Sequence, residues 1–375
     1  MHVRKLDGGA AARDCPKGDG ETMEGWDLYL SETEGRATSA CHEIFSLHAR
    51  LSNYAMSALA TILSLVASLA RPFGHRSAAL TIAPRDQTRP IVFTHMPKTS
   101  GTAIVHGLLG ALDPSRPIGG FDMSQFSKES NFVGIKAELQ SSIYHDTADI
   151  PRDADFVFGH LAASTTFSIY PQAQHITFLR EPLSRVLSHY LYWRSLDETA
   201  LSPWGELGTR VHAAHAPLVE FLSNNNLACQ IDNIYVRMLL WPHVLIPDSG
   251  WIDPTDDDQL VDAALQRLHA YSYVDIIENP AMQSSLHKWL GGNFDYSRMN
   301  VTAKIPPKLR RGLDSELTPG TTTLLVERSR LDLRLWQAVA ASRSASIAPA
   351  VLQLMALLPA IARYGQLMVG SDLNL

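Results

Sequence analysis

The chain has few cysteines and lacks the short motifs of several large enzyme classes. Only Cys15, Cys41 and Cys229 occur in 375 residues, and they are widely spaced. The sequence therefore shows no disulfide framework and no C-x-x-C metal pair, which favours a reducing compartment, although two of the cysteines could still pair. G-x-G-x-x-G, H-E-x-x-H and G-x-S-x-G are absent. Dinucleotide dehydrogenases, zinc proteases and serine hydrolases of those types therefore lack support.

An excess of positive charge is also missing. The formal net charge is −6 and the sequence pI is about 6.2, which argues against a general nucleic-acid binder. Any anion site must therefore be basic only locally. Hydrophobic residues make up 45% of the chain, enough for a substantial core, and no internal repeat is found.

The most informative segment is residues 90–102, which read PIVFTHMPKTSGT. Ile91 to Thr94 is typical of a buried strand, and an apolar helical pattern runs from Ala103 to Leu112. Between them lies a loop of small and hydroxyl residues that contains Lys98. A strand, a small-residue loop and a helix start are suited to hold a phosphate, because free N–H groups and the helix dipole favour an anion.

The spacing of this loop differs from that of a Walker A motif. Walker A requires a lysine after both glycines, in the order G-x-x-x-x-G-K-[ST]. Here Lys98 precedes Gly101, the only glycine of the loop. The segment predicts a phosphate-like ligand held differently from the nucleotide of a P-loop ATPase.

A second motif follows a second predicted strand, His175 to Leu179. Its sequence is REPLSRVLSHY from Arg180 to Tyr190. Proline at the third position suits the first turn of a helix. Arg180 at the strand end and Ser188 two turns along the helix could reach one anion. Arg185 is either a further contact or an ordinary exposed helix residue.

Together the two motifs resemble the PAPS-dependent sulfotransferases, where PAPS is 3′-phosphoadenosine 5′-phosphosulfate. The first motif is similar to the 5′-phosphosulfate loop H-x-P-K-T-G-G-T, and the second to the 3′-phosphate site R-x-P-x-x-R-x-x-S-x-Y. The resemblance covers about residues 90–340 and is greatest to the carbohydrate, 2-O-sulfotransferase-like branch. It implies an α/β fold with a mainly parallel sheet flanked by helices, the P-loop-like sulfotransferase fold.

The resemblance also implies the cofactor and its contacts. PAPS would be bound and released as adenosine 3′,5′-bisphosphate (PAP). Arg180 and Ser188 would hold its 3′-phosphate. A late loop with Asn300 and Thr302 would close over the nucleotide, unless that basic loop is simply solvated. The phosphosulfate would lie on Pro97, Lys98, Thr99, Ser100, Gly101, Thr102 and Ala103. One departure is Ser100, where the family usually has glycine.

Two residues are the predicted catalytic groups. Lys98 is expected to stabilise the leaving oxygen, because charge develops there during sulfuryl transfer. His160, at the end of a predicted strand from Asp155, is the predicted base for the acceptor hydroxyl. The uronyl branch has a histidine base in a similar G-H context. The alternative for His160 is a hydrogen bond within its own loop. No metal is required.

The rest of the sequence predicts alternating elements and two flanking regions. A strand at Tyr273–Ile277 and helices at Pro217–Ser223, Asn233–Trp241, Gln259–Ala270 and Met282–Leu290 complete one domain over 90–340. Three carboxylates, Asp256 to Asp258, are interpreted as helix-start residues rather than metal ligands. Residues 341–375 are expected to form a pair of packed helices, interrupted by Pro349 and Pro359.

The first 89 residues are expected to be an extension. Residues 1–50 have a disordered composition, and residues 71–89 would be a linker. Residues 51–70 carry no charge and suit either an amphipathic helix, associated with a membrane surface, or a membrane span. The predicted localisation is cytoplasmic and membrane-associated, with a single-pass membrane protein as the alternative.

Three functions are weighed on this basis. The first is a sulfotransferase that acts on a carbohydrate or glycolipid hydroxyl, with no nucleic-acid partner. The second is a P-loop-type small-molecule kinase, which would need an acidic strand end to hold magnesium. The third is a catalytically inactive, sulfotransferase-like binding protein.

Overall fold

The computed structural model describes residues 59–62, 64, 79–128, 130–292, 294–295, 303–344 and 346–369. Contacts divide the chain into Met1–Cys41 and His42–Leu375, and all described residues belong to the second unit. The predicted extension 1–50 and the cofactor residues Asn300 and Thr302 lie outside the described residues.

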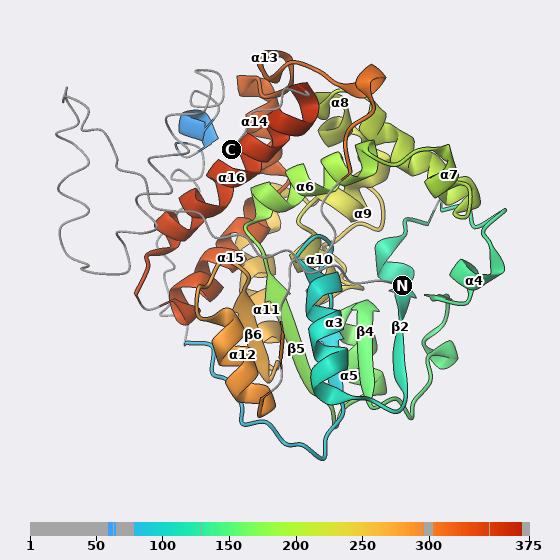
Figure 1. The fold of residues 1–375 in the computed structure, drawn as a ribbon, viewed down its shortest axis with the longest axis vertical. Coiled ribbons are helices and arrows are strands. Elements are labelled where there is room, and N and C mark those ends of the chain that lie inside the picture. Colours follow the sequence, from blue (N-terminus) through green and yellow to red (C-terminus); the bar gives the residue numbers. More distant parts are fainter. Residues whose placement is uncertain are drawn as a thin grey trace, which may run out of the picture. The chain divides into compact units, whose positions relative to one another are not determined.

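One parallel sheet forms the centre of the second unit (Figure 1). Its strand order is β3-β2-β4-β1-β5-β6, and each pairing between neighbouring strands is parallel. The strands are β1 (Ile91–Thr94), β2 (Pro117–Asp122), β3 (Ile143–Tyr144), β4 (Phe156–His160), β5 (Gln174–Leu179) and β6 (Tyr273–Ile276). The predicted α/β class with a parallel sheet flanked by helices is confirmed.

The helices connect the strands and form the carboxy-terminal region. They are α3 (Gly101–Leu112), α4 (Ala137–Gln140), α5 (Ala163–Ile169), α6 (Pro182–Arg194), α7 (Glu198–Leu201), α8 (Leu218–Ser223), α9 (Ala228–Ile231), α10 (Ile234–Leu240), α11 (Asp257–His269), α12 (Met282–Leu290), α13 (Leu313–Glu316), α14 (Pro319–Glu327), α15 (Arg330–Arg343) and α16 (Pro349–Val369). An 11-residue 3₁₀ segment, η3 (Gly205–His215), follows α7.

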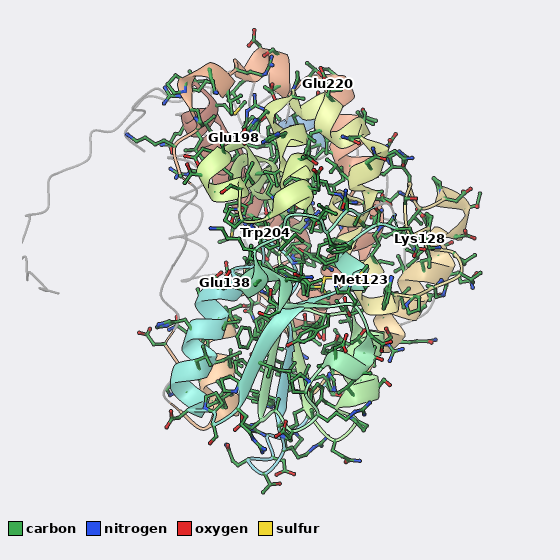
Figure 2. The ribbon with its side chains drawn as sticks, turned by 90° about the vertical axis from the view of Figure 1, so that its right-hand side faces the viewer. Met123, Lys128, Glu138, Glu198, Trp204 and Glu220 are labelled. Carbon is green, nitrogen blue, oxygen red and sulfur yellow. The ribbon has the colours of Figure 1, made fainter. Side chains whose placement is uncertain are left out.

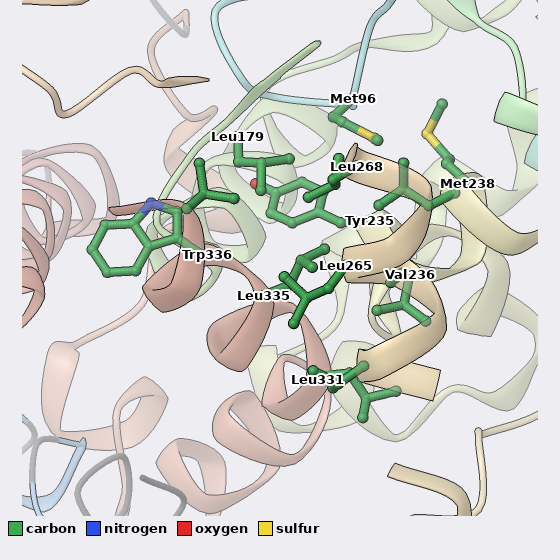
Figure 3. Close-up of a cluster of buried hydrophobic side chains, with 14 of the residues drawn as sticks. Met96, Leu179, Tyr235, Val236, Met238, Leu265, Leu268, Leu331, Leu335 and Trp336 are labelled. Atoms are coloured by element: carbon green, nitrogen blue, oxygen red, sulfur yellow. The ribbon is translucent and has the colours of Figure 1, made fainter. Parts of the chain in front are cut away.

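Both faces of the sheet are buried because its strands carry apolar residues on each side. Ile91 and Phe93 of β1 pack with α3 and α12 on one face. Val92, between them, packs with residues of β4 and α5 on the other face. On that second face a larger cluster joins Leu179 to α10, α11 and α15 around Trp336, as Figure 3 shows. These layers fix the positions at which the strands end.

The carboxy-terminal segment differs from its prediction. Instead of two helices broken at Pro349 and Pro359, α16 is one helix of 21 residues that begins at Pro349 and contains Pro359. By length and composition it could cross a membrane, but 61% of its apolar window is buried inside the protein. It packs along α6 (Figure 1). Burial of its apolar side chains overrides the break that proline favours.

Parts of the predicted amino-terminal extension contact the domain. Residues 59–62 and 64 are helical, and Leu59 and Ile62 are buried in the core cluster around α6 and α16. In the predicted linker, the Leu80 N–H donates to Ser342 Oγ at 2.9 Å, and Trp289 Nε1 donates to the Ala83 carbonyl at 2.8 Å. Residues 79–89 therefore lie on the domain.

The three predicted helix-start aspartates lie at the beginning of α11. Asp257 and Asp258 are in its first turn, and the Asp256 side chain makes no capping hydrogen bond. Asp257 instead pairs with Arg330 at 2.9 Å, and Asp258 with Arg334 at 2.8 Å. Among the described residues no group of three or more histidine, cysteine or acidic side chains is arranged to hold a metal.

Candidate functional site

Three neighbouring strands bring the predicted residues to one edge of the sheet. His160 ends β4, Lys98 follows β1, and Arg180 follows β5, and these strands are adjacent in the order β4-β1-β5. Because all three are parallel, their carboxyl ends meet at the same edge, where ligands bind in such sheets. Sequence positions 98, 160 and 180 therefore share one site.

The phosphate loop has a tight backbone. Lys98 and Ser100 both have positive φ, 66° and 61°, a region that non-glycine residues seldom adopt. Alternating turns of this kind direct backbone N–H groups into a concavity that suits an anion. Ser100 is the N-cap of α3 but makes no side-chain capping bond. Glycine would adopt this backbone conformation freely, whereas Ser100 adopts it with some strain.

Gly101 is required by the ring of His95. A Cβ built on Gly101 would lie 1.7 Å from His95 Nε2, so a larger residue cannot occupy this position without moving the ring. The His95 ring itself stacks on Phe93 at 5.6 Å and lies 4.4 Å from the His160 ring. Glycine therefore lets the loop pack directly on the histidine pair.

This geometry predicts opposite effects at two adjacent loop positions. Gly101→Ala is expected to lower the free energy of unfolding by about 1–3 kcal/mol, because the new methyl group overpacks against His95. Ser100→Gly is the matched control and is expected to be neutral or to stabilise by up to about 1 kcal/mol, since it relieves a left-handed serine. Urea unfolding of both variants measures this. A Gly101→Ala variant as stable as the parent chain would contradict the packing argument.

Arg180 connects the loop to α6. Its Nη1 donates to the Lys98 carbonyl at 3.2 Å, and its Nε donates to Ser184 Oγ at 3.1 Å. Ser188 lies one turn beyond Ser184 and one turn before Tyr192, on the same side of the helix. The Lys98 ammonium lies 4.0 Å from the centre of the Tyr192 ring. Ser188 is therefore flanked by residues that contact Arg180 and Lys98.

Lys98 is a cation without a paired carboxylate. The described residues show no ion pair to Lys98 or to Arg180. Burial, and next the charge of Arg180, lower the pKa of Lys98 to about 8. The two cations repel one another at this end of the sheet, so a bound anion would relieve this repulsion.

His160 is held in one tautomer. Its Nδ1 lies 2.6 Å from the His95 carbonyl oxygen, which can only accept, so Nδ1 carries the hydrogen. Nε2 is left with its lone pair. Burial lowers the pKa of His160 to about 4, which the bond to His95 partly opposes and the Lys98 charge assists. His160 is therefore neutral near pH 7, with Nε2 left to accept a proton. Its hydrogen bond runs to His95, 65 residues away in the sequence, and not within its own loop.

The remaining residues of the phosphate loop differ in how far their side chains are exposed. Thr99 is fully buried, and its hydroxyl donates to the Met96 carbonyl at 2.8 Å, so only its backbone can face a ligand. Pro97 and Ala103 are buried, while Thr102 is exposed at the start of α3. Gly101, Thr102 and Ala103 form the first turn of α3, where N–H groups have no acceptor within the helix.

The Glu181 side chain caps the start of α6. Its Oε2 accepts from the Ser184 N–H at 2.7 Å, and its Oε1 accepts from Gln353 Nε2 of α16 at 3.1 Å. Its backbone N–H donates to Glu278 Oε1 at 2.8 Å. Burial raises the pKa of Glu181 to about 7. This side chain has a structural role in capping the helix that carries Ser188.

Two residues of α6 were not predicted correctly from the sequence. Arg185, for which an exposed position was one interpretation, is 1% exposed, and that interpretation is wrong. His189 was not singled out, yet it is 4% exposed. The signal that identifies them is the polar spacing of positions 185, 188, 189 and 192, opposite the apolar face of the helix.

The comparisons of this chain with protein-family models and curated proteins found no match.

Proposed function

We propose that the protein is a PAPS-dependent sulfotransferase of the P-loop-like fold that acts on a carbohydrate hydroxyl. The observation that carries this proposal is the hydrogen bond from Arg180 Nη1 to the Lys98 carbonyl, 3.2 Å long. It joins the two motifs that resemble the 5′ and 3′ ends of a PAPS site. One nucleotide with an anionic group at each end could contact both motifs at once.

The proposed reaction is an in-line transfer. The acceptor oxygen forms a bond to sulfur while the bond from sulfur to the bridging phosphate oxygen breaks, and PAP leaves. The hydroxyl proton goes to His160 Nε2, and Lys98 stabilises the negative charge on the leaving oxygen. The His95 carbonyl holds the base in the tautomer that this role requires. Every group in this scheme belongs to the chain, to PAPS or to the acceptor.

Aromatic side chains beside the base support a sugar acceptor. The Phe121 ring lies 5.2 Å from the His160 ring, and Trp204 meets Phe121 edge-on at 5.9 Å. Figure 2 shows Trp204 and Met123 at the upper edge of the sheet, where the strands end. Aromatic faces next to polar groups suit the apolar sides of sugar rings. A carbohydrate or glycolipid acceptor remains our proposal on this ground and on the resemblance.

The acidic residues near the strand ends give little support to the kinase alternative. Asp122 accepts from the Ala162 N–H at 2.7 Å and from the Ser124 N–H at 3.1 Å. Glu278 accepts from the Glu181 N–H and from Trp336 Nε1. These carboxylates accept hydrogen bonds from N–H groups of the protein, and none of the ion pairs among the described residues joins either of them to Lys98. An inactive binding protein would share the site but show no turnover.

The cellular compartment that we propose is inferred from the sequence alone. A cytoplasmic, membrane-associated protein is our inference from the cysteine content and from residues 51–70, with a single-pass protein as the alternative. Most of residues 51–70 lie outside the described residues.

The decisive experiment is a comparison of two nucleotides by isothermal titration calorimetry. PAP is expected to bind at least about tenfold more tightly than ADP, a difference of about 1.4 kcal/mol, because only PAP carries a 3′-phosphate for Arg180 and Ser188. ADP serves as the matched control with the same adenosine and a 5′-anion. Equal affinities, or no binding of either nucleotide, would refute the proposed cofactor.

A further inference from the structure

The charged end of the Lys98 side chain lies over an aromatic ring of α6. Its ammonium is 4.0 Å from the centre of the Tyr192 ring, which is within the range of a cation–π interaction. Lys98 follows β1 and Tyr192 lies in the last turn of α6, so the contact joins two segments distant in the sequence. It is separate from the hydrogen bond that Arg180 donates to the Lys98 carbonyl. Arg180 therefore holds the backbone of Lys98, and Tyr192 holds its ammonium.

No carboxylate competes with this ring for the Lys98 ammonium. Within the part of the chain that the structure describes, none of the ion pairs includes Lys98. A charge that is partly removed from water needs an electron-rich partner, and the face of an aromatic ring is negative. The Tyr192 ring is therefore the partner of this cation in the ligand-free protein.

Packing of the core does not explain the position of the Tyr192 ring. Its neighbours in the sequence, Tyr190 and Leu191, are buried in the core cluster around α6 and α16. Tyr192 lies outside that cluster and is 41% exposed. Substitution of an exposed side chain away from the core usually changes stability little. A variant at this position therefore tests the contact with Lys98 rather than the folding of α6.

We propose that Tyr192 is a positioning residue that holds the Lys98 ammonium in the candidate site before the nucleotide binds. This inference rests on the proposed function, in which Lys98 stabilises the charge on the leaving oxygen. A cation that is already in place needs no reorganisation during the transfer. The ring attracts the charged amine, whereas burial and the charge of Arg180 favour the neutral one. Tyr192 therefore acts on the reaction through Lys98.

Four other titratable or charged groups interact with Lys98, and they determine what a pH titration reports. They are His95 before the loop, His160 at the end of β4, and Arg180 and His189. Burial, and to a smaller extent the charge of Lys98, lowers the pKa of all three histidines, so their rings are neutral above pH 7. A guanidinium keeps its charge in this range. Between pH 7 and pH 9, Lys98 is therefore the group of this set that changes its charge.

The test measures the affinity for PAP between pH 6.5 and pH 9 by isothermal titration calorimetry. Tyr192→Leu keeps an apolar side chain beside Lys98 but removes the aromatic face. We expect it to weaken PAP binding by about three- to tenfold at pH 7.5. The alkaline decrease in affinity should begin about half a pH unit to one unit lower, because the charged amine loses its partner. Tyr192→Phe, the matched control, keeps the ring and should retain both the affinity, within about twofold, and the pH profile.

A double-mutant cycle shows whether the effect passes through Lys98. In a Lys98→Ala background, Tyr192→Leu should change PAP affinity by less than about twofold, because no ammonium is left for the ring to hold. The same loss in both backgrounds would mean that Tyr192 contacts the nucleotide itself, and would overturn the positioning role. An unchanged affinity and pH profile in Tyr192→Leu would overturn it as well. A parent protein that does not bind PAP would instead overturn the proposed function. Should Tyr192→Leu not fold, Tyr192→Gln, which also lacks the ring, replaces it with the same expectation.

Discussion

Arg180→Ala is expected to remove the preference for PAP over ADP. Loss of charged hydrogen bonds to the 3′-phosphate should weaken PAP binding by about 30- to 150-fold, or about 2–3 kcal/mol. ADP affinity should fall by no more than about threefold, because the Lys98 loop remains to hold its phosphates. Isothermal titration with both nucleotides gives the two numbers directly.

A matched arginine controls for the loss of one positive charge. Arg116 lies at the opposite edge of the sheet, where it pairs with Asp153 at 2.7 Å in an exposed position. Arg116→Ala should leave both affinities unchanged. If Arg180→Ala weakened PAP and ADP to the same extent, Arg180 would act on the loop, through its bond to the Lys98 carbonyl, and not on a 3′-phosphate.

Lys98 gives the second large effect, and it depends on pH. Its ammonium is charged below its pKa of about 8 and loses its proton above it. An anion binds the charged form, so PAP affinity should be constant below pH 8 and then decrease by up to about tenfold per pH unit. Calorimetry between pH 6.5 and pH 10 measures this decrease. The direction follows from burial and from Arg180, which both favour the neutral amine.

Two variants at position 98 define the cause of that decrease. Lys98→Arg should keep its charge throughout and remove the alkaline decrease, because a guanidinium is not deprotonated in this range. Lys98→Ala should bind PAP more weakly at every pH and lower the turnover of PAPS to PAP by about 100- to 1000-fold. A parent protein whose PAP affinity stays constant to pH 10 would show that Lys98 does not contact the anion.

The strands that carry the site could be predicted from the sequence, whereas strand β2 could not. β1, β5 and β6 are apolar, β-branched or aromatic runs, and they were expected within a residue or two of their observed ends. β2 has the sequence PIGGFD, which reads as a turn. Its glycines are needed because a Cβ on Gly120 would lie 2.4 Å from the Ser142 carbonyl, so close strand approach replaces β propensity there.

The site shows a similar division. Spacing predicted that Lys98, Arg180 and Ser188 lie near one another, because strand ends and helix turns place such residues predictably. The burial of Arg185 and His189 could not be predicted, since a sequence pattern shows that a helix face is polar but not that other elements cover it. Burial of that face depends on contacts distant in sequence, such as the hydrogen-bond distance of 3.4 Å between Arg185 Nη2 and the Ile231 carbonyl.

A hydrogen bond between Gln353 and Glu181 connects α16, the last helix, to the start of α6. The two residues are 172 positions apart in the sequence. The Glu181 carboxylate that accepts from Gln353 also caps α6, the helix on which Ser188 lies. Helix α16 therefore supports the start of α6 through this carboxylate. If the proposed function holds, a chain truncated before Pro349 is expected to bind PAP more weakly, although every residue of the candidate site is retained.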